Sequence, residues 1–440
     1  MNYSETVDYL FHSLPVFHHS GGTAYKPGLQ TIRELSAFYG HPHTQYPSIH
    51  IAGTNGKGSV AHMLAAVLQG CGYTTGLFTS PHLIDFRERI KVNGEWISEQ
   101  EVTEFVEKSI DVLKQTEASF FEVTTAMAFD HFARRKVDVA VIEAGMGGRL
   151  DATNIITPVL SVITNISTDH VQFLGNTPAA IASEKAGIIK PGIPVVIGET
   201  QAETAPVFET KAGEMQTFVL FADQYADVGR SMTTTEGQTF HILQHGKAHP
   251  IPVKIDLSGE YQRKNIITVL MTVQALRVHT NIRLKAEHIV PALEHAAQTT
   301  GLHGRWETLQ QHPRVICDSA HNTAGIAWVT GQLKNCTFRT LRMIIGFVSD
   351  KDITGMLKLL PADAVYYFTN ADIPRALNAK TLKRKAQPHG LAGKSYPSVP
   401  DALKAALADA ASDDLIFVGG SIFVVSEILK LFTDVHRAAK

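Results

Sequence analysis

The chain has 440 residues, which is more than one ordinary hydrophobic core holds, so its length predicts two domains. Hydrophobic residues make up 44% and charged residues 19%, as in ordinary globular proteins. The formal net charge of -2 argues against a nucleic-acid-binding surface. No run approaches the roughly 20 apolar residues of a membrane span. We therefore expect no nucleic-acid partner and no membrane association.

The N-terminus and the cysteines indicate the compartment. The opening stretch MNYSETVDYLFHSLPVF lacks the basic start and long apolar core of a signal peptide. The three cysteines form no CxxC pair and no even framework, which suits a reducing environment. These features predict a cytoplasmic protein.

The N-terminal two-thirds alternates short apolar runs with helix-length amphipathic segments. The runs are rich in β-branched residues and fit strands buried on both faces of a parallel sheet: 48–53, 139–145, 159–166 and 194–198. The helical patterns between them cover 57–70, 99–115, 122–135 and 178–189. This βαβ order predicts an α/β doubly wound, mostly parallel sheet.

The pattern changes after residue 200. Residues 200–256 show period-2 stretches and turn residues, which indicates a β-rich part, and helices are expected near 262–278 and 285–298. The polar segment TTGLHGR (299–305) is a candidate hinge. A second βα pattern follows, with strands expected at 314–321, 342–347, 364–370 and 414–421. We expect one α/β domain at 1–300 and a smaller Rossmann-like α/β domain at 301–440, with ligands at the C-terminal ends of their strands.

The stretch HIAGTNGKGSV (50–60) joins an expected strand to an expected helix through a glycine-rich loop. In a P-loop, backbone N–H groups surround phosphate oxygens, a lysine reaches the β- and γ-phosphates, and a hydroxyl binds Mg²⁺. The spelling here departs from GxxxxGK[ST], because the glycine interval is short and Gly58 separates Lys57 from Ser59. A turn that only reverses the chain is the alternative, but three glycines in seven residues favour a phosphate site.

Three residues at neighbouring strand ends are candidate Mg²⁺ ligands: Ser80, Glu143 and His170. Glu143 is the most informative, because a carboxylate that ends an apolar strand is costly to bury unless it is paired or bound to metal. His170 alone fits a hydrogen-bonded core histidine equally well, and the Ser-Pro pair at 80–81 is also a common turn element.

Other polar residues are ambiguous by themselves. Lys185 lies in a mostly apolar helix, where a snorkelling lysine is the simplest interpretation. Arg149 and Asp151 form either a loop ion pair or contacts to an anionic substrate. In the second domain, CDSAHN (317–322), SDKD (349–352) and GGSIF (419–423) follow expected strands and together suggest a second binding face.

The order of these motifs resembles one family. AGTNGKGS, FTSPHL with RERI, FFEVTTAMAF, EAGMGGRLDATN, ITNISTDHVQFLGNT, IASEKAGIIKPG, DSAHN and SDKD occur as in folylpolyglutamate synthase and dihydrofolate synthase, which are Mur-ligase-like ATP-dependent amide ligases. The resemblance is dense over 50–200 and thinner over 300–425. It departs at Gly259-Glu260-Tyr261-Gln262, where the family usually has histidine in place of Tyr261.

The resemblance implies a role for each matching position. Asn55, Gly56, Lys57, Gly58 and Ser59 would form the triphosphate loop, with ATP contacts also from Asn265, Arg305 and Asp318. Ser80, Glu143 and His170 would bind Mg²⁺, and Lys185 would be carbamylated and organise a second ion. The implied substrate residues are Phe121, Glu122, Leu150, Asp151 and Ala152 for the pterin, and His321 and Ser421 for glutamate.

The resemblance also implies the reaction. ATP phosphorylates a carboxyl group, and the amine of L-glutamate attacks the acyl phosphate to give an amide, ADP and phosphate; Lys57, Glu143, His170 and Lys185 would serve catalysis. Whether dihydropteroate, tetrahydrofolate or both are accepted stays open, and a monomer is expected. A cell-wall Mur ligase is the alternative enzyme, although FTSPHL and EKAGIIKPG argue against it. A nucleotide switch protein would instead require a strict P-loop.

Overall fold

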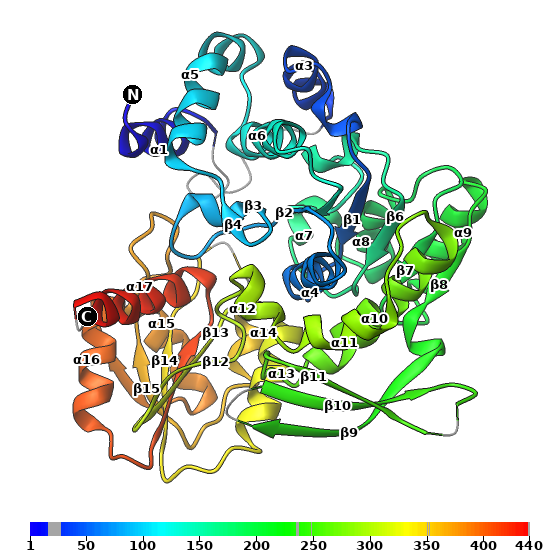
Figure 1. Ribbon diagram of the computed structural model, residues 1–440. Helices are drawn as coiled ribbons and strands as arrows, with labels where there is room; N and C mark the ends of the chain where they lie inside the picture. The colour runs from blue at the N-terminus through cyan, green and yellow to red at the C-terminus, as the bar shows by residue number, and fades with distance from the viewer. Residues whose placement is uncertain (16–27, 235–236, 248, 350, 352, 439–440) are drawn as a thin grey trace. The chain divides into compact units, whose positions relative to one another are not determined.

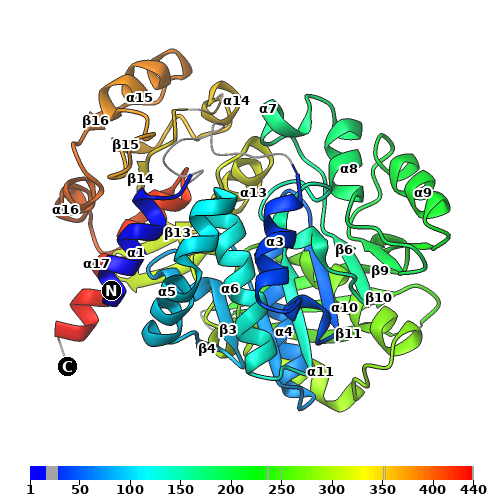
Figure 2. The same ribbon diagram turned by 90° about the horizontal axis from the view of Figure 1, so that it is seen from above.

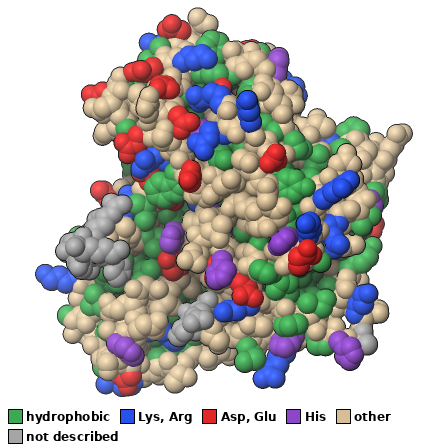
Figure 3. Space-filling model, viewed as in Figure 1, with side chains coloured by type: hydrophobic (Ala, Val, Ile, Leu, Met, Phe, Trp, Pro, Cys, Tyr) green, Lys and Arg blue, Asp and Glu red, His purple; other side chains and the backbone are tan. Residues whose placement is uncertain are grey.

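The computed structural model describes residues 1–15, 28–234, 237–247, 249–349, 351 and 353–438. It has two compact units. The first comprises Met1–His82, Phe86–Asp256 and Tyr261–Leu302, and the second comprises Leu83–Asp85, Leu257–Glu260 and His303–Lys440. In the ranges described, no helix is long and apolar enough to cross a bilayer. On the face drawn in Figure 3, lysine and arginine side chains lie among aspartates and glutamates.

The first unit is built on an eight-stranded sheet in the order β4-β3-β2-β5-β1-β6-β7-β8 (Figure 1). Its strands are β1 (Ser48–Ala52), β2 (Thr75–Phe78), β3 (Ile90–Val92), β4 (Glu95–Trp96), β5 (Val139–Glu143), β6 (Leu160–Ile163), β7 (Val195–Ile197) and β8 (Val219–Phe221). Neighbours pair in parallel except β2 with β3 and β3 with β4. Every residue of β1 and β5 is buried, which explains their continuous apolar character. The predicted doubly wound, mostly parallel sheet is confirmed.

Helices cover both faces of this sheet. The elements on the side of α4 are α4 (Lys57–Gly70), α10 (Gln262–His279), α11 (Ala286–Leu293) and α12 (Ala296–Thr300), and α4 contacts the other three. The opposite side carries α1 (Tyr3–His12), α3 (Gln30–Phe38), α5 (Glu99–Thr116), α6 (Phe120–Arg134), α8 (Pro178–Ala186) and α9 (Ala205–Glu214). Figure 2 shows α3, α5 and α6 side by side. Short helical elements are η2 (Pro42–Thr44), η3 (Phe86–Arg89), η4 (Ala152–Ile155), α7 (Val171–Leu174) and η5 (Ala222–Gln224).

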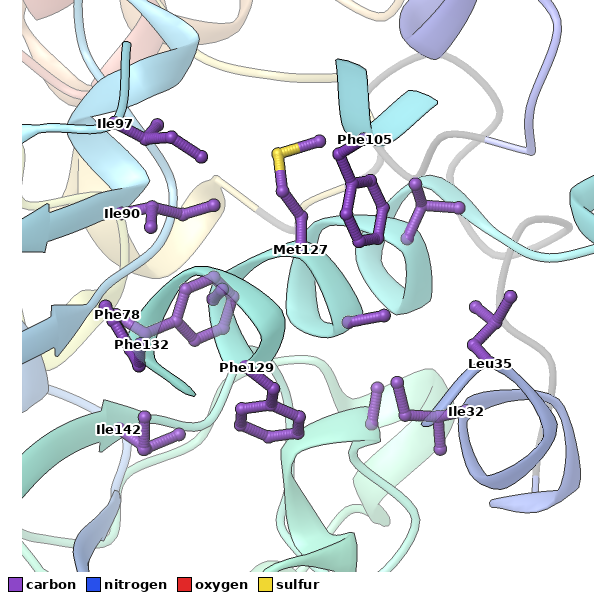
Figure 4. Packing of buried hydrophobic residues seen from close by; sticks show 14 of the residues in the cluster. Ile32, Leu35, Phe78, Ile90, Ile97, Phe105, Met127, Phe129, Phe132 and Ile142 are labelled. Carbon is purple, nitrogen blue, oxygen red and sulfur yellow. The ribbon is translucent and has the colours of Figure 1, made fainter. Parts of the chain in front are cut away.

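One hydrophobic core of the first unit lies between α6 and the sheet. Figure 4 shows Phe129 and Phe132 of α6 among side chains from β2, β3, β5, α3 and α5. Both phenylalanines are fully buried, and burial of one such ring contributes about 2 kcal/mol. This packing fixes α6 against the strands whose C-terminal ends carry the candidate site.

The segment expected to be β-rich holds both types of structure. Its first part forms α9 and then β8, which joins the large sheet. Its second part forms a separate antiparallel sheet in the order β11-β10-β9 from β9 (Ala226–Thr234), β10 (Gly237–Gln244) and β11 (Ile251–Ile255).

The second unit has a six-stranded sheet in the order β12-β13-β17-β14-β15-β16. Its strands are β12 (Glu307–Gln311), β13 (Arg314–Asp318), β14 (Leu341–Ile345), β15 (Val365–Phe368), β16 (Gly393–Ser395) and β17 (Leu415–Gly419). Its helices are α13 (Thr323–Leu333), α14 (Thr354–Leu357), α15 (Ala379–Ala386), η6 (Gln387–His389), α16 (Val399–Asp409) and α17 (Ile422–Ala438). Among the described strands of this unit, β12 at the edge runs antiparallel to its neighbour and the others pair in parallel. The predicted Rossmann-like α/β fold is confirmed.

Candidate active site

The glycine-rich loop connects the end of β1 to the start of α4. Gly56 is the N-cap of α4 and has φ +84°, a conformation that favours glycine. A Cβ at Gly56 would overlap Asn265 Oδ1, and a Cβ at Gly53 would overlap Thr164 Oγ1. The loop is therefore closely enclosed, and its glycines are needed for space as well as for backbone conformation.

Two lysines converge on one carbonyl of this loop. Lys57 Nζ donates to Gly53 O at 3.2 Å and to Thr54 O at 3.3 Å, and Lys185 Nζ donates to Gly53 O at 2.8 Å. Lys185 is 4% exposed, so the snorkelling interpretation of this lysine is wrong. Burial, together with the charge of Lys57, lowers the pKa of Lys185 to about 7. The carboxylates of Asp169 and Asp151 oppose that shift.

Side chains from α10 complete the loop's surroundings. Gln262 Nε2 donates to Ser59 Oγ at 3.2 Å, and Asn265 Nδ2 donates to Gln262 Oε1 at 2.7 Å. All three side chains are buried. The hydrogen bonds link Ser59 of the loop to Asn265, which lies more than 200 positions later in the chain. Tyr261, the departure from the family pattern, is the N-cap of this helix.

Two residues after β6 also hold the loop. Thr164 Oγ1 donates to Asn55 O at 2.6 Å, and Asn55 N donates to Asn165 Oδ1 at 3.0 Å. Sequence reasoning did not single out Thr164 or Asn165. The available signal was their position directly after the apolar strand β6 (Leu160–Ile163).

Of the three expected metal ligands, Glu143 and Ser80 lie together at the ends of neighbouring strands, and His170 lies seven residues beyond the end of β6. Glu143 is the last residue of β5 and is 3% exposed, and its Oε2 accepts a hydrogen bond from Ser80 N at 3.2 Å. The parallel pairing of β2 with β5 brings these two residues together. His170 is the N-cap of α7 and has φ +50°. Its backbone N–H donates to Asp169 Oδ1 at 2.8 Å.

The donor types at this edge suit Mg²⁺, which prefers oxygen ligands and keeps several waters or phosphate oxygens. Glu143 supplies a buried carboxylate and Ser80 a neighbouring hydroxyl, which fits such a partial ligand set. Among the residues described, no group of three or more His, Cys, Asp or Glu side chains forms a complete protein metal site.

Two of the expected pterin contacts have local hydrogen-bonding roles. Glu122 Oε2 accepts from Ser119 N at 2.8 Å and from Ser119 Oγ at 2.7 Å, which makes Glu122 part of the capping box of α6. Asp151 Oδ2 accepts from Met146 N at 2.8 Å, and its Oδ1 accepts from Thr153 N at 3.0 Å. Burial raises the pKa of Asp151, and these hydrogen bonds oppose the shift.

The other expected pterin contacts lie close to these two. A Cβ at Gly145 would clash with the ring of Phe121, so the loop after Glu143 passes directly over that ring. Leu150 is half-buried and Ala152 is buried beside Asp151. Arg149 pairs with Glu184 at 2.8 Å on the surface.

The second unit brings its candidate residues to the C-terminal ends of β13 and β17. Asp318 ends β13, and its carboxylate accepts from Trp306 N and Ala320 N, both at 2.8 Å. Arg305 donates to Ser319 Oγ. The two residues expected to bind glutamate also make contacts within this unit. His321 Nδ1 lies 2.9 Å from Ser319 O, and Ser421 Oγ accepts a hydrogen bond from Phe423 N at 3.2 Å. Asp350 and Asp352 of SDKD lie outside the described residues.

Comparison with known proteins identifies both halves of the chain. Residues 51–273 match the Mur ligase middle domain, and residues 304–422 match the Mur ligase glutamate ligase domain. The chain is 36% identical to dihydrofolate synthase/folylpolyglutamate synthase of Bacillus subtilis over 92% of this chain and 95% of that protein. It is 35% identical to folylpolyglutamate synthase of Lacticaseibacillus casei over 97% of this chain and 98% of that protein.

Solved structures agree with these matches. Mycobacterium tuberculosis folylpolyglutamate synthase complexed with ADP and AMPPCP has a TM-score of 0.86 and 33% identity, covering 98% of this chain and 99% of that chain. Escherichia coli FolC in complex with DHPP and ADP has a TM-score of 0.83 and 27% identity, covering 99% of each chain. The chain therefore belongs to the folylpolyglutamate synthase and dihydrofolate synthase family of Mur ligases.

Proposed function

We propose that this protein is an ATP-dependent ligase that joins the amino group of L-glutamate to the carboxyl group of dihydropteroate, to the γ-carboxyl group of a glutamylated tetrahydrofolate, or to both. The observation that carries the proposal is the convergence of Lys57 and Lys185 on Gly53 O. The Lys57 ammonium beside this carbonyl creates a positive site at the N-terminus of α4, where an anionic triphosphate is favoured.

The reaction proceeds in two steps. The substrate carboxylate attacks the γ-phosphorus of ATP, the bond to ADP breaks, and an acyl phosphate forms. The neutral amine of glutamate then attacks the acyl carbon, the amide bond forms, phosphate leaves with the bonding electron pair, and the amine loses a proton. Lys57 and the loop N–H groups of 55–59 hold and neutralise the phosphates, which lowers the barrier through positioning and electrostatics.

Ser80, Glu143 and His170 are proposed to hold Mg²⁺, which neutralises phosphoryl charge when bound. Lys185 is proposed to be carbamylated. Because its pKa is lowered to about 7, a large fraction of its amine is neutral near pH 7. That amine can attack CO₂, forming an N–C bond with loss of a proton, and the resulting carboxylate could bind a second Mg²⁺.

The two units divide the remaining tasks in this proposal. Residues 1–300 act as the ATP-binding domain, in which Asn265 contacts ATP and the region around Phe121, Glu122 and 150–152 accepts the pterin. Residues 301–440 act as the glutamate-ligase domain, in which Arg305 and Asp318 contact ATP. His321 and Ser421 at its strand ends are proposed to bind glutamate.

The relatives favour a folate substrate over a cell-wall precursor. The Bacillus subtilis relative is named for both folate activities and the Lacticaseibacillus casei relative for one of them. We propose a pteroyl substrate on this basis, and the assay below separates dihydropteroate from tetrahydrofolate. We further propose that the protein is a monomer and that it acts in the cytoplasm. The three free cysteines support the reducing compartment.

The test is to assay the purified protein with ATP, Mg²⁺ and glutamate, and with either dihydropteroate or tetrahydrofolate. Product masses and phosphate release are measured together, and reactions lacking glutamate or the pteroyl compound are the controls. We expect phosphate release only when all substrates are present, with a mass increase of one glutamyl residue. Phosphate release that needs neither glutamate nor pteroyl compound would instead indicate a nucleotide switch protein.

A further inference from the structure

A histidine lies at the centre of the large sheet, where most neighbours are aliphatic. His50 is the middle residue of β1, is 0% exposed, and pairs in register with Ile142 on one side and Ser161 on the other. Burial lowers the pKa of His50 to about 3, so the ring is neutral at physiological pH. A buried imidazole costs free energy unless its polar atoms are satisfied, so its hydrogen bonds are informative.

One ring nitrogen of His50 begins a chain of hydrogen bonds. His50 Nε2 lies 2.8 Å from Thr153 Oγ1, and Thr153 Oγ1 donates to Asp151 Oδ1. The Asp151 carboxylate also accepts backbone N–H groups from Thr153 and Met146. Donors on both of its oxygens favour the ionised carboxylate, which can only accept.

This arrangement fixes the protons. The Thr153 hydroxyl has a single hydrogen, which is directed to Asp151, so Thr153 Oγ1 must accept from His50 Nε2–H. His50 Nδ1 then carries a lone pair and no hydrogen. It has no hydrogen-bond partner among the described residues, which is consistent with this tautomer, because an unmet lone pair is tolerated better than an unmet N–H.

The chain ends on the loop that follows Glu143. Asp151 closes this loop by accepting from Met146 N at one end and by capping η4 at the other. The loop lies at the C-terminal end of β5, where parallel sheets of this type bind ligands, and it passes over Phe121. The hydrogen-bond chain from His50 therefore ends on the carboxylate that holds both ends of this loop.

We propose that His50 is a positioning residue for the pteroyl substrate: by donating through Thr153 to Asp151 it fixes the loop 144–151 that borders the pterin site. This inference rests on the proposed function. It predicts a selective effect, because the ATP loop 53–59 is held by different side chains, namely Thr164, Asn165, Gln262 and Asn265.

The kinetic test uses paired variants. His50→Leu removes the hydrogen-bond donor, and Thr153→Val removes the hydroxyl that relays it. Each should raise KM for the pteroyl substrate about tenfold, as expected for one lost buried hydrogen bond. KM for ATP should stay within about twofold of the parent value. His50→Gln and Thr153→Ser keep a donor at the same place and should stay within about threefold of the parent. The double variant His50→Leu/Thr153→Val should be no worse than either single variant, since both act through one chain.

Tyr46→Phe is the matched control. It removes a buried hydrogen bond to Phe129 O near the opposite end of the same strand, so it measures the effect of destabilising the fold without touching the loop. Equal increases in KM for both substrates, or an increase no larger than that of Tyr46→Phe, would overturn the proposal. If His50→Leu does not fold, Thr153→Val and Thr153→Ser make the same comparison.

A second readout does not depend on activity. The ¹⁵N shifts of the His50 ring, assigned by their loss in His50→Gln, should show a proton on Nε2 and no titration at physiological pH. A proton on Nδ1 would contradict the hydrogen-bond chain even in an active enzyme. If the parent protein ligates neither pteroyl substrate while the ring shows the Nε2–H form, the proposed function fails and the hydrogen-bond chain stands.

Discussion

Replacing Gly56 by alanine tests whether the close enclosure of the phosphate loop matters for ATP. The new methyl group would overlap Asn265 Oδ1 and lie 3.1 Å from Asn265 Cγ, so the amide would have to move by roughly 1 Å. That movement would break the bond from Asn265 Nδ2 to Gln262, and with it the link to Ser59. A misplacement of about 1 Å in a catalytic site costs on the order of 100-fold in rate, which we expect in kcat/KM for ATP.

Gly72→Ala is the control, because Gly72 shares the backbone conformation without the enclosure. It has φ +89°, against +84° for Gly56, and nothing lies within 4 Å of its Cβ position. Both variants should lose about 1–2 kcal/mol from the left-handed conformation, partly offset by a smaller loss of chain entropy on folding. The melting temperature of Gly56→Ala should fall further than that of Gly72→Ala, by the equivalent of about 1 kcal/mol for the lost buried hydrogen bond between Asn265 and Gln262.

The two variants should differ in activity far more than in stability. Steady-state kinetics with varied ATP, at a saturating pteroyl substrate and glutamate, gives kcat/KM for each. Values for Gly56→Ala and Gly72→Ala within about threefold of one another would refute the reasoning, because the two differ only in what surrounds the methyl group.

Four further variants test other parts of the structure. Lys57→Ala should abolish ATP-dependent product formation, and near-normal turnover would remove the phosphate-loop assignment. Lys185→Ala should lose activity that high bicarbonate cannot restore but small added carboxylates partly rescue; a fully active variant would exclude the carbamate. Lys91 is buried and its pKa is lowered to about 8 from 10.5, so between these values the unfolded chain binds a proton that the folded protein does not, and stability rises with pH. Thermal denaturation of Lys91→Met from about pH 7.5 to about pH 9.5 should show a smaller rise than the parent. Asp414→Ala should lower the free energy of unfolding in urea by about 3 kcal/mol, because it leaves Arg342 without its fully buried carboxylate partner, and a loss below about 1 kcal/mol would contradict this.

The central strands of both sheets were predictable because burial on two faces makes them continuous apolar runs. β1, β5, β13 and β17 fall within the expected ranges for this reason. The helix α9 was not predicted, because its segment mixes alanine, glycine and polar residues without a clear helical period. The short strand pair β3 and β4 was also not predicted, since three- and two-residue strands have no periodicity to detect.

Some residues of the candidate site could also be recognised from the local sequence, and others could not. The glycine loop and Glu143 could be recognised locally, because each is an unusual residue choice at the end of an apolar strand. Glu122 was assigned to substrate although Ser119 stands three residues before it, a spacing that also predicts a capping box, and the structure shows that box. Its carboxylate thus has a structural role that any contact with substrate would have to share.

Lys185 shows why the rest could not be read from the sequence. Its neighbours in α8 describe only an apolar helix, and a lysine in such a helix normally extends to solvent. Lys185 is buried instead because its amine donates to Gly53 O, which lies 132 residues earlier in the chain. The two residues meet only because folding brings the start of the phosphate loop next to the end of α8. The same holds for His50, whose polar character was visible in an apolar strand while Thr153, its partner 103 residues away, was not. In both cases a local sequence conflict marks a buried polar group, and the long-range contact decides whether that group is a defect or part of the site.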